Sequence, residues 1–161
     1  TGVQTCALPI CATQSVRVVT PYFLPPEVLT TALTLAAMRG IAVDIVVPER
    51  SNYTILDWAR RVPLRDLVAA GCRVWLQPSP FAHTKLMVID GTWAMIGSAN
   101  WDTRSFRLNF ELNVEVQDAE FARRLIAATP GHRRLTLAEL DADPPALRLR
   151  NAAARLLQPY L

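Results

Sequence analysis

Residues 83–100 read HTKLMVIDGTWAMIGSAN, and this stretch decides how we expect the chain to fold. Residues 84–89 are rich in β-branched and apolar types, and Asp90-Gly91-Thr92 has the composition of a turn. Residues 93–96 then begin a second apolar run. The pattern predicts a β-hairpin that brings the two ends of the stretch side by side.

The predicted hairpin gathers four polar side chains. Because side chains alternate along a strand, we expect His83 and Lys85 on one face and Asp90 on the opposite face. A hairpin closed by a two-residue loop pairs residues whose numbers add up to an odd total, which puts Ser98 and Asn100 on the face of His83. One surface would then hold an imidazole, an ammonium, a hydroxyl and an amide.

These four groups suit phosphoryl chemistry. The imidazole of His83 can attack phosphorus or carry a proton near neutral pH, and Lys85 can neutralise phosphate oxygens. Ser98 and Asn100 can donate hydrogen bonds to the remaining oxygens, and the set needs no metal ion. A lone histidine beside a strand is usually a surface or core residue, so the combination, and not His83 by itself, indicates a phosphate-handling site.

Six residues at fixed spacing resemble the HKD signature of the phospholipase D superfamily: His83-x-Lys85-x4-Asp90 followed by x6-Gly97-Ser98-x-Asn100. Three flanking segments are similar to the C-terminal half of bacterial cardiolipin synthases: TPYFLP at 20–25, AAMRG at 36–40 and NWDTRSFRLNFE at 100–111. The likeness runs from about Val16 to the C-terminus. It implies an α/β fold with a mixed β-sheet flanked by helices, as one phospholipase D-like half-domain.

The resemblance also implies a mechanism. HKD enzymes build one site from two motifs, in which one histidine forms a phosphohistidine and the other protonates the departing alcohol. This chain carries one motif, so the expected partner is an N-terminal HKD half encoded upstream of Val16, and the fragment alone is expected to be inactive. The C-terminal motif is often given the acid role in this superfamily, which favours that role for His83, although its spacing leaves nucleophile and acid open.

Further site residues follow from the same resemblance. Asp90 belongs to the catalytic signature, and Glu111 stands where HKD enzymes place a carboxylate that accepts a hydrogen bond from the imidazole. Such a carboxylate would fix the tautomer of His83. Arg104 and Arg107 are candidates for binding a lipid phosphate or head group, and ion pairing with Asp102 is the alternative.

Cardiolipin synthases imply transfer of a phosphatidyl group from one phosphatidylglycerol to another, with no metal and no cofactor. The implied partners are an anionic phospholipid and the membrane surface, with no nucleic acid. The implied location is the bacterial cell membrane, on the cytoplasmic side or as a peripheral protein. No apolar run in the sequence reaches the length of a membrane span.

Composition and the two ends set the domain organisation. The chain has 161 residues, 51% hydrophobic and 19% charged, which is typical of one globular domain, and its formal charge is +3. Residues 1–10 match the translation of a sequencing adapter, and we interpret them as non-native sequence. Residues 11–135 are expected to form the phospholipase D-like domain. Residues 136–161 are expected to form a basic amphipathic segment that docks on its own domain or lies on an anionic membrane.

Strand and helix patterns alternate before the hairpin. We expect strands at 16–20, 41–47 and 73–77, separated by helices at 26–39 and at 52–70, with Asn52 as a candidate cap and an interruption before Pro63. After Asn100 we expect a loop, a strand over 108–116 with one apolar face, and a helix over 118–128. The last helix, to about Leu157, is expected to have Leu149, Ala153, Leu156, Leu157 and Tyr160 on one side and Asn151 on the other.

Two other functions remain open from the sequence. The first is a single-motif nuclease of the same superfamily that completes its site as a homodimer. The second is a non-catalytic lipid-binding module, for which His83→Ala would leave the biological effect unchanged.

Overall fold

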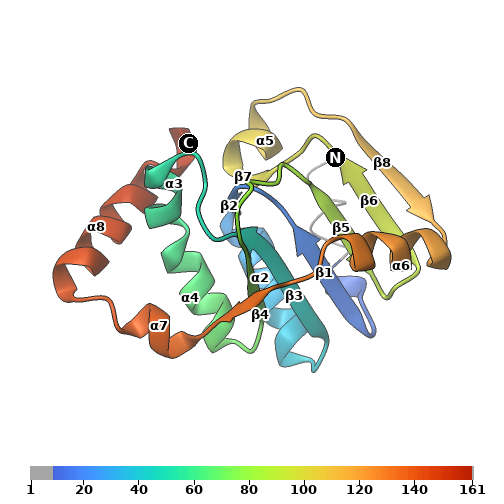
Figure 1. The fold of residues 1–161 in the computed structure, drawn as a ribbon, viewed down its shortest axis with the longest axis horizontal. Helices are drawn as coiled ribbons and strands as arrows, with labels where there is room; N and C mark the ends of the chain where they lie inside the picture. The colour runs from blue at the N-terminus through green and yellow to red at the C-terminus, as the bar shows by residue number, and fades with distance from the viewer. Residues whose placement is uncertain (1–8, 161) are drawn as a thin grey trace.

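A seven-stranded mixed sheet forms the centre of the molecule (Figure 1). The computed structural model describes residues 9–160, so most of the segment interpreted as non-native lies outside the described residues. The strands lie in the order β8-β6-β5-β1-β3-β4-β9. Their bounds are β1 Ser15–Val19, β3 Ala42–Pro48, β4 Arg73–Gln77, β5 Leu86–Ile89, β6 Trp93–Gly97, β8 Asn113–Gln117 and β9 Arg133–Leu135. The α/β fold with a mixed sheet flanked by helices is confirmed.

Strands β1, β3 and β4 are parallel and the other pairs are antiparallel, as the alternation of strand and helix patterns predicts. Alternate residues of these strands face opposite sides of the sheet, so Val18 and Val19 belong to different apolar clusters. Helices α2 (Glu27–Met38) and α4 (Arg61–Ala69) cover one face. Helix α6 (Ala119–Ala128) covers the other face. Burial of both faces explains why the central strands are almost wholly apolar.

A small second sheet, absent from the sequence-based prediction, ties β1 to the segment that follows the motif. Strand β2 (Phe23–Leu24) pairs in parallel with β7 (Trp101–Asp102). Phe23 and Trp101 are buried and stack with ring centroids 6.3 Å apart. The backbone N–H of Trp101 also donates to the hydroxyl of Thr20 at 3.2 Å. Two-residue strands are too short for periodicity to reveal them.

The hairpin exists, but its register differs from the prediction. Ile89 pairs with Trp93 and Leu86 with Ile96, so the loop has three residues and facing numbers add up to an even total. The extra loop residue is accommodated by positive φ angles at Asp90 and Gly91. The argument that placed Ser98 and Asn100 opposite His83 is therefore wrong, because Lys85 faces Gly97 and the chain leaves β6 after that residue.

The predicted strand over 108–116 is only half correct. Residues 103–107 form a short helix, α5 (Thr103–Arg107), and residues 108–112 follow it without regular structure. Strand β8 begins at Asn113, where pairing with Gly97 becomes possible. The predicted first helix of the 52–70 region begins two residues later than expected, as α3 (Thr54–Ala59) with Tyr53 as its N-cap in place of Asn52.

The C-terminal segment packs on the domain through the face opposite to the one expected. Helix α7 (Leu137–Asp141) begins with a capping box, and α8 (Pro145–Leu156) and a 3-10 turn (Gln158–Tyr160) follow. Asn151 and Ala154 are the buried residues of α8, and Ala154 packs with residues of α3, whereas Leu149 and Leu156 are exposed. Among residues 9–160, no helix combines the length and the apolar character that a bilayer crossing requires.

Candidate active site

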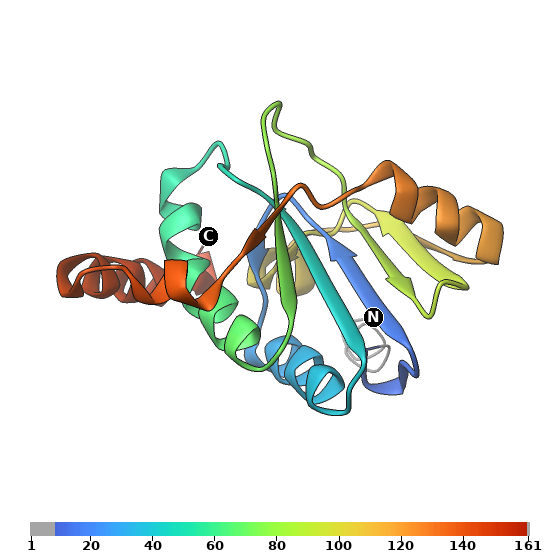
Figure 2. The same cartoon turned by 60° about the horizontal axis from the view of Figure 1, so that its bottom comes forward.

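The motif lies where several loops meet at one edge of the sheet. His83 precedes β5 and Ser98 follows β6, while Tyr22 follows β1 and Glu111 precedes β8. Because β5 is antiparallel to both β1 and β6, these chain ends fall on the same edge. Figure 2 shows the light-green segment between β4 and β5, which carries His83, projecting beyond the sheet. The fold therefore assembles the site from segments up to 90 residues apart in the sequence.

His83 and Lys85 are in direct contact. The Lys85 ammonium lies 2.9 Å from Nδ1 of His83 and donates to the His83 carbonyl at 2.9 Å. An ammonium has no lone pair, so it can only donate, which makes Nδ1 the acceptor and leaves the proton of the neutral imidazole on Nε2. Attack through Nε2 would first require that proton to leave, and donation of a proton to a leaving alcohol would first require the ring to be protonated on both nitrogens.

The environment favours a neutral imidazole. Partial burial and then the charge of Lys85 lower the pKa of His83. Burial also lowers the pKa of Lys85, although the carboxylates of Glu111 and Asp102 act in the opposite direction. Lys85 is thus the positive group of this pair, and its charge would be neutralised by a phosphate.

Two aromatic rings and an amide fix the position of the imidazole. Tyr22 and Phe81 lie edge-on to His83, with centroids 5.5 and 5.4 Å away. The Tyr22 hydroxyl lies 3.4 Å from Nε2 of His83 and donates to Oδ1 of Asn52 at 2.7 Å. Sequence reasoning missed the roles of Tyr22 and Asn52. The Thr-Pro-Tyr sequence directly after the first strand was the available signal, since residues after parallel strands meet at one edge.

Ser98 and Glu111 form the second part of the cluster. The Ser98 hydroxyl donates to the Glu111 carboxylate and accepts from the backbone N–H of Leu112 at 3.0 Å, and Asn109 donates to Glu111 at 3.1 Å. Burial raises the pKa of Glu111, but hydrogen bonds from Ser98 and Asn109 outweigh it and the pKa falls below its usual value. No hydrogen bond between Glu111 and His83 exists among the described residues, so the expected orienting contact is replaced by one to Ser98.

Gly97 allows the backbone of Leu112 and Asn113 to approach β6 closely. A Cβ atom at Gly97 would lie 2.2 Å from Oδ1 of Asn113 and 2.3 Å from the backbone oxygen of Leu112. Any larger residue would push these neighbours away, and with them the segment that carries Glu111. The glycine of the signature therefore serves a close backbone approach.

Asn100 lies beside α5. Its backbone N–H donates to the Ser105 hydroxyl at 3.2 Å, and its side-chain Oδ1 is buried without a hydrogen-bond donor among the described residues. Asp102 caps α5 by accepting from the Ser105 N–H at 2.7 Å, and burial raises the pKa of this carboxyl. The cap thus holds Ser105 in place and supports Asn100.

Asp90 is at the opposite end of β5 from His83, so the structure does not place it in the catalytic cluster. Its carboxylate accepts from the backbone N–H groups of Thr13, Gln14 and Ser15 at 2.8–3.2 Å. Burial alone would raise the pKa of Asp90, but these bonds lower it to about 2. Through these hydrogen bonds, Asp90 connects the hairpin loop to the start of β1.

Arg104 and Arg107 lie on α5 and are exposed. Among residues 9–160, neither forms an ion pair, so the alternative of pairing with Asp102 is not realised. Both guanidinium groups remain available to an anion, but no contact joins them to His83.

The chain is similar to known proteins in sequence and in fold. A family model described as "Cardiolipin synthase, PLD-like domain" matches residues 11–129. The chain is 36% identical over 154 residues to the major cardiolipin synthase ClsA of Bacillus subtilis (strain 168), which covers 93% of this chain and 32% of that protein. The chain therefore spans about a third of the length of this relative.

Two solved structures share the fold. Nuc from Salmonella typhimurium, a phospholipase D family member, superposes with a TM-score of 0.73 at 21% identity, over 83% of this chain and 90% of that one. The phosphatidylserine synthase of Haemophilus influenzae Rd KW20 gives 0.74 at 18% identity, over 98% of this chain and 44% of that one. The family match over most of the chain and the identity to ClsA establish that this chain belongs to the cardiolipin synthase PLD-like domain family.

Proposed function

We propose that this chain supplies one half of the active site of a phosphatidyltransferase. The complete enzyme would transfer a phosphatidyl group from one phosphatidylglycerol to a second and release glycerol. The observation that carries the proposal is the contact of His83 with Lys85 beside the Ser98–Glu111 pair, at one edge of the sheet. The donor and acceptor lipids rest on the family relationship.

The roles of the residues follow from their chemistry. Lys85 neutralises the phosphate oxygens, and Ser98 and Asn100 hydrogen-bond to the substrate. In the first step one histidine of the pair forms a bond to phosphorus while the other gives its proton to the glycerol oxygen as the P–O bond breaks. In the second step the proton of the incoming hydroxyl returns to that histidine, as oxygen replaces nitrogen on phosphorus.

The second histidine must come from another half-domain, and the segment before β8 offers a surface for it. Glu111 faces Ser98, whereas the alternate side chains Leu108, Phe110, Leu112 and Val114 are exposed. We call these four residues the apolar row. A contiguous apolar surface of this kind is typical of an interface. Its position beside Glu111 would bring a covering half-domain close to the site, and we assign it to the half that carries the other HKD motif.

The membrane surface is the other partner of the proposal, because the substrate is a lipid. Leu149 and Leu156 of helix α8 and Tyr160 of the following 3-10 turn are exposed, and so is Arg148 of α8. An apolar stripe next to basic side chains suits the interface of an anionic bilayer. A peripheral contact through α8 is therefore consistent with the family's lipid chemistry.

A chimera tests the proposal. Replacing the matching third of the Bacillus subtilis ClsA with this chain should give an enzyme that forms cardiolipin in phosphatidylglycerol vesicles, whereas the chain alone should form none. Phe110→Asp should lower turnover at least tenfold, because a charge in the apolar row would oppose docking. Val28→Asp, at an exposed position of α2, is the matched control and should leave turnover unchanged.

Three outcomes would contradict the proposal. The first is a folded chimera without turnover, and the second is equal turnover of the Phe110→Asp and wild-type chimeras. The third is phosphodiester cleavage of DNA by a dimer of the chain alone, which would support the nuclease alternative.

A further inference from the structure

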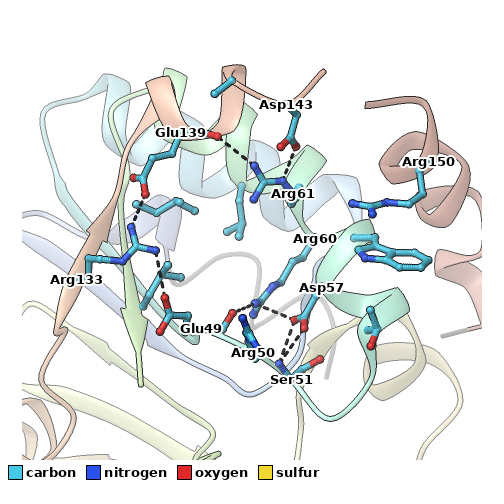
Figure 3. A pocket seen from close by; sticks show the side chains of 16 residues that line it. Glu49, Arg50, Ser51, Asp57, Arg60, Arg61, Arg133, Glu139, Asp143 and Arg150 are labelled. Carbon is cyan, nitrogen blue, oxygen red and sulfur yellow. Dashed lines mark hydrogen bonds and ion pairs between the residues drawn. The ribbon is translucent and has the colours of Figure 1, made fainter. Parts of the chain in front are cut away.

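A second pocket lies outside the His83 cluster. It has a volume of about 770 Å³ and opens between the loop after β3 and helices α3, α4, α7 and α8 (Figure 3). None of the residues that line it belongs to the HKD signature. Its size is within the range of small-molecule sites. Nothing in the proposed transfer reaction uses it.

The wall of the pocket is rich in arginine. Five guanidinium groups face four carboxylates: Arg50, Arg60, Arg61, Arg133 and Arg150 against Glu49, Asp57, Glu139 and Asp143. Each carboxylate is held by an arginine of the wall: Asp57 by Arg60 at 2.8 Å, Asp143 by Arg61 at 2.7 Å, and Glu49 (3.4 Å) and Glu139 by Arg133. Three arginines thus pair with all four carboxylates, Arg133 being shared by two of them, and the five arginines of the lining outnumber its carboxylates by one.

Two of the five arginines take no part in these ion pairs. Among residues 9–160, neither Arg50 nor Arg150 has a carboxylate partner. The guanidinium of Arg150 lies 4.3 Å from the centre of the Trp58 ring, and its Nε and Nη2 donate to Asn151 at 3.3 and 3.0 Å. Figure 3 shows Arg150 extending from α8 toward the cavity. Stacking holds the planar group in place and leaves Nη1 free to donate.

Hydrogen bonds from Arg60 hold the start of the loop that carries Arg50. Arg60 is buried and donates to the backbone oxygens of Pro48 and Glu49 at 2.8 and 3.0 Å. Thr54, whose hydroxyl has no hydrogen bond among the described residues, also lines the pocket. The site therefore offers two guanidinium groups outside the ion pairs of the wall and a hydroxyl, with an aromatic ring as one wall.

We propose that this pocket binds a phosphate group that carries a small polyol, held by Arg50 and Arg150. The lining carries one more arginine than carboxylates, which favours an anion, and the N–H groups of the two guanidinium groups without carboxylate partners match the oxygens of a phosphate. The volume leaves room for a glycerol unit beside Trp58. A lipid head group and a free glycerol phosphate share this chemistry, so the experiment separates these two sources.

The pocket also adjoins the catalytic cluster. Arg50 and Asn52 belong to the same loop, and Asn52 accepts the hydrogen bond from Tyr22, whose ring lies against His83. A ligand that orders this loop would therefore also restrain Tyr22. The phosphate site itself does not depend on the proposed transfer activity.

The test uses the chain with Lys85→Gln, so that phosphate is not held by the motif. Glycerol 3-phosphate is titrated into this protein by calorimetry. Adding Arg50→Gln or Arg150→Gln should raise the dissociation constant at least tenfold, and Arg150→Lys should be intermediate because it keeps the charge but loses the planar fork. Arg123→Gln removes the same charge from an exposed position of α6 and should leave the dissociation constant unchanged.

Equal affinity in all variants, or an equal loss with Arg123→Gln, would overturn the proposal. Arg50→Gln keeps the test valid if Arg150→Gln unfolds, because Arg50 is exposed and makes no ion pair among the described residues. Sedimentation with phosphatidylglycerol or phosphatidylcholine vesicles then identifies the source. Binding to the anionic vesicles that depends on Arg50 indicates a lipid head group, and soluble binding without such dependence indicates a free phosphate ester.

Discussion

At the scale of single residues, the contact between Lys85 and His83 controls the protonation of the imidazole. Lys85→Gln removes a positive charge from the neighbourhood of Nδ1, so the pKa of His83 should rise. The Cε1–H signal of His83 in an NMR pH titration measures this shift. The signal of His132, the other histidine of the chain, serves as an internal control. An unchanged or lower pKa would contradict the role given to Lys85.

Asp90 is predicted to stabilise the fold and not the reaction. Asp90→Ala should lower the free energy of unfolding at pH 7 by about 1 kcal/mol, the usual cost of losing a cap at a solvent-accessible position. The pKa of Asp90 is about 2 in the folded chain against a reference of 3.8, so the charged form contributes stability above pH 3.8. That contribution should disappear as the pH falls through 2. Urea unfolding at several pH values tests this, and a pH-independent difference would contradict it.

The sequence predicted the groups of the motif better than their arrangement. His83 and Lys85 are two residues apart, so their proximity follows from local geometry. Tyr22 and Asn52 reach the site only through pairing between distant strands, which a single sequence does not specify. Glu111 was expected to contact His83, but its carboxylate accepts a hydrogen bond from Ser98, whose hydroxyl also accepts from the backbone N–H of Leu112.

At the scale of elements, α8 has one face that packs against the domain and one face that is exposed. Ala154→Gln should lower the free energy of unfolding by about 1–3 kcal/mol, because a larger polar side chain would enter a closed contact with α3. Leu149→Gln with Leu156→Gln should change it by less than about 0.5 kcal/mol, since both side chains are exposed. Thermal unfolding distinguishes the two. The reverse order would mean that the leucine face docks, as the amphipathic pattern predicted.

The same leucine face is predicted to contact lipid. Leu149→Gln with Leu156→Gln should reduce sedimentation with phosphatidylglycerol vesicles several-fold while the protein stays folded, because burial of two leucines contributes to interfacial binding. Ala153→Gln introduces the same residue at a further exposed position of α8 but removes only a methyl group. It is the matched control and should reduce vesicle binding less. Unchanged vesicle binding would remove α8 from the proposed membrane contact.

The hairpin and the segment after it show where element prediction reached its limit. Composition placed the turn at Asp90-Gly91-Thr92, but only backbone φ angles decide between two and three loop residues. Alternation over 108–116 predicted one strand with one apolar face. The structure instead exposes the apolar row, because α5 ends just before it and β8 begins only at Asn113. A pattern of alternation shows that a face is apolar but not what covers it.

At the scale of the whole molecule, the sheet and its helices followed from the sequence because the parallel strands are largely buried and each crossover contains a helix. Strands β2 and β9 have too few residues for a pattern and were not predicted. Under the proposed function, the apolar row beside the motif is the surface that a second half-domain covers.

The central claim is that His83 reacts at phosphorus or carries the proton in phosphatidyl transfer. Turnover of phosphatidylglycerol by the chimera with ClsA, in which this chain replaces the matching third, measures it most directly. His83→Ala should reduce cardiolipin formation at least a thousandfold, while His132→Ala should leave it within twofold of the unsubstituted chimera. Cardiolipin formation at an unchanged rate by a folded His83→Ala chimera would contradict the account.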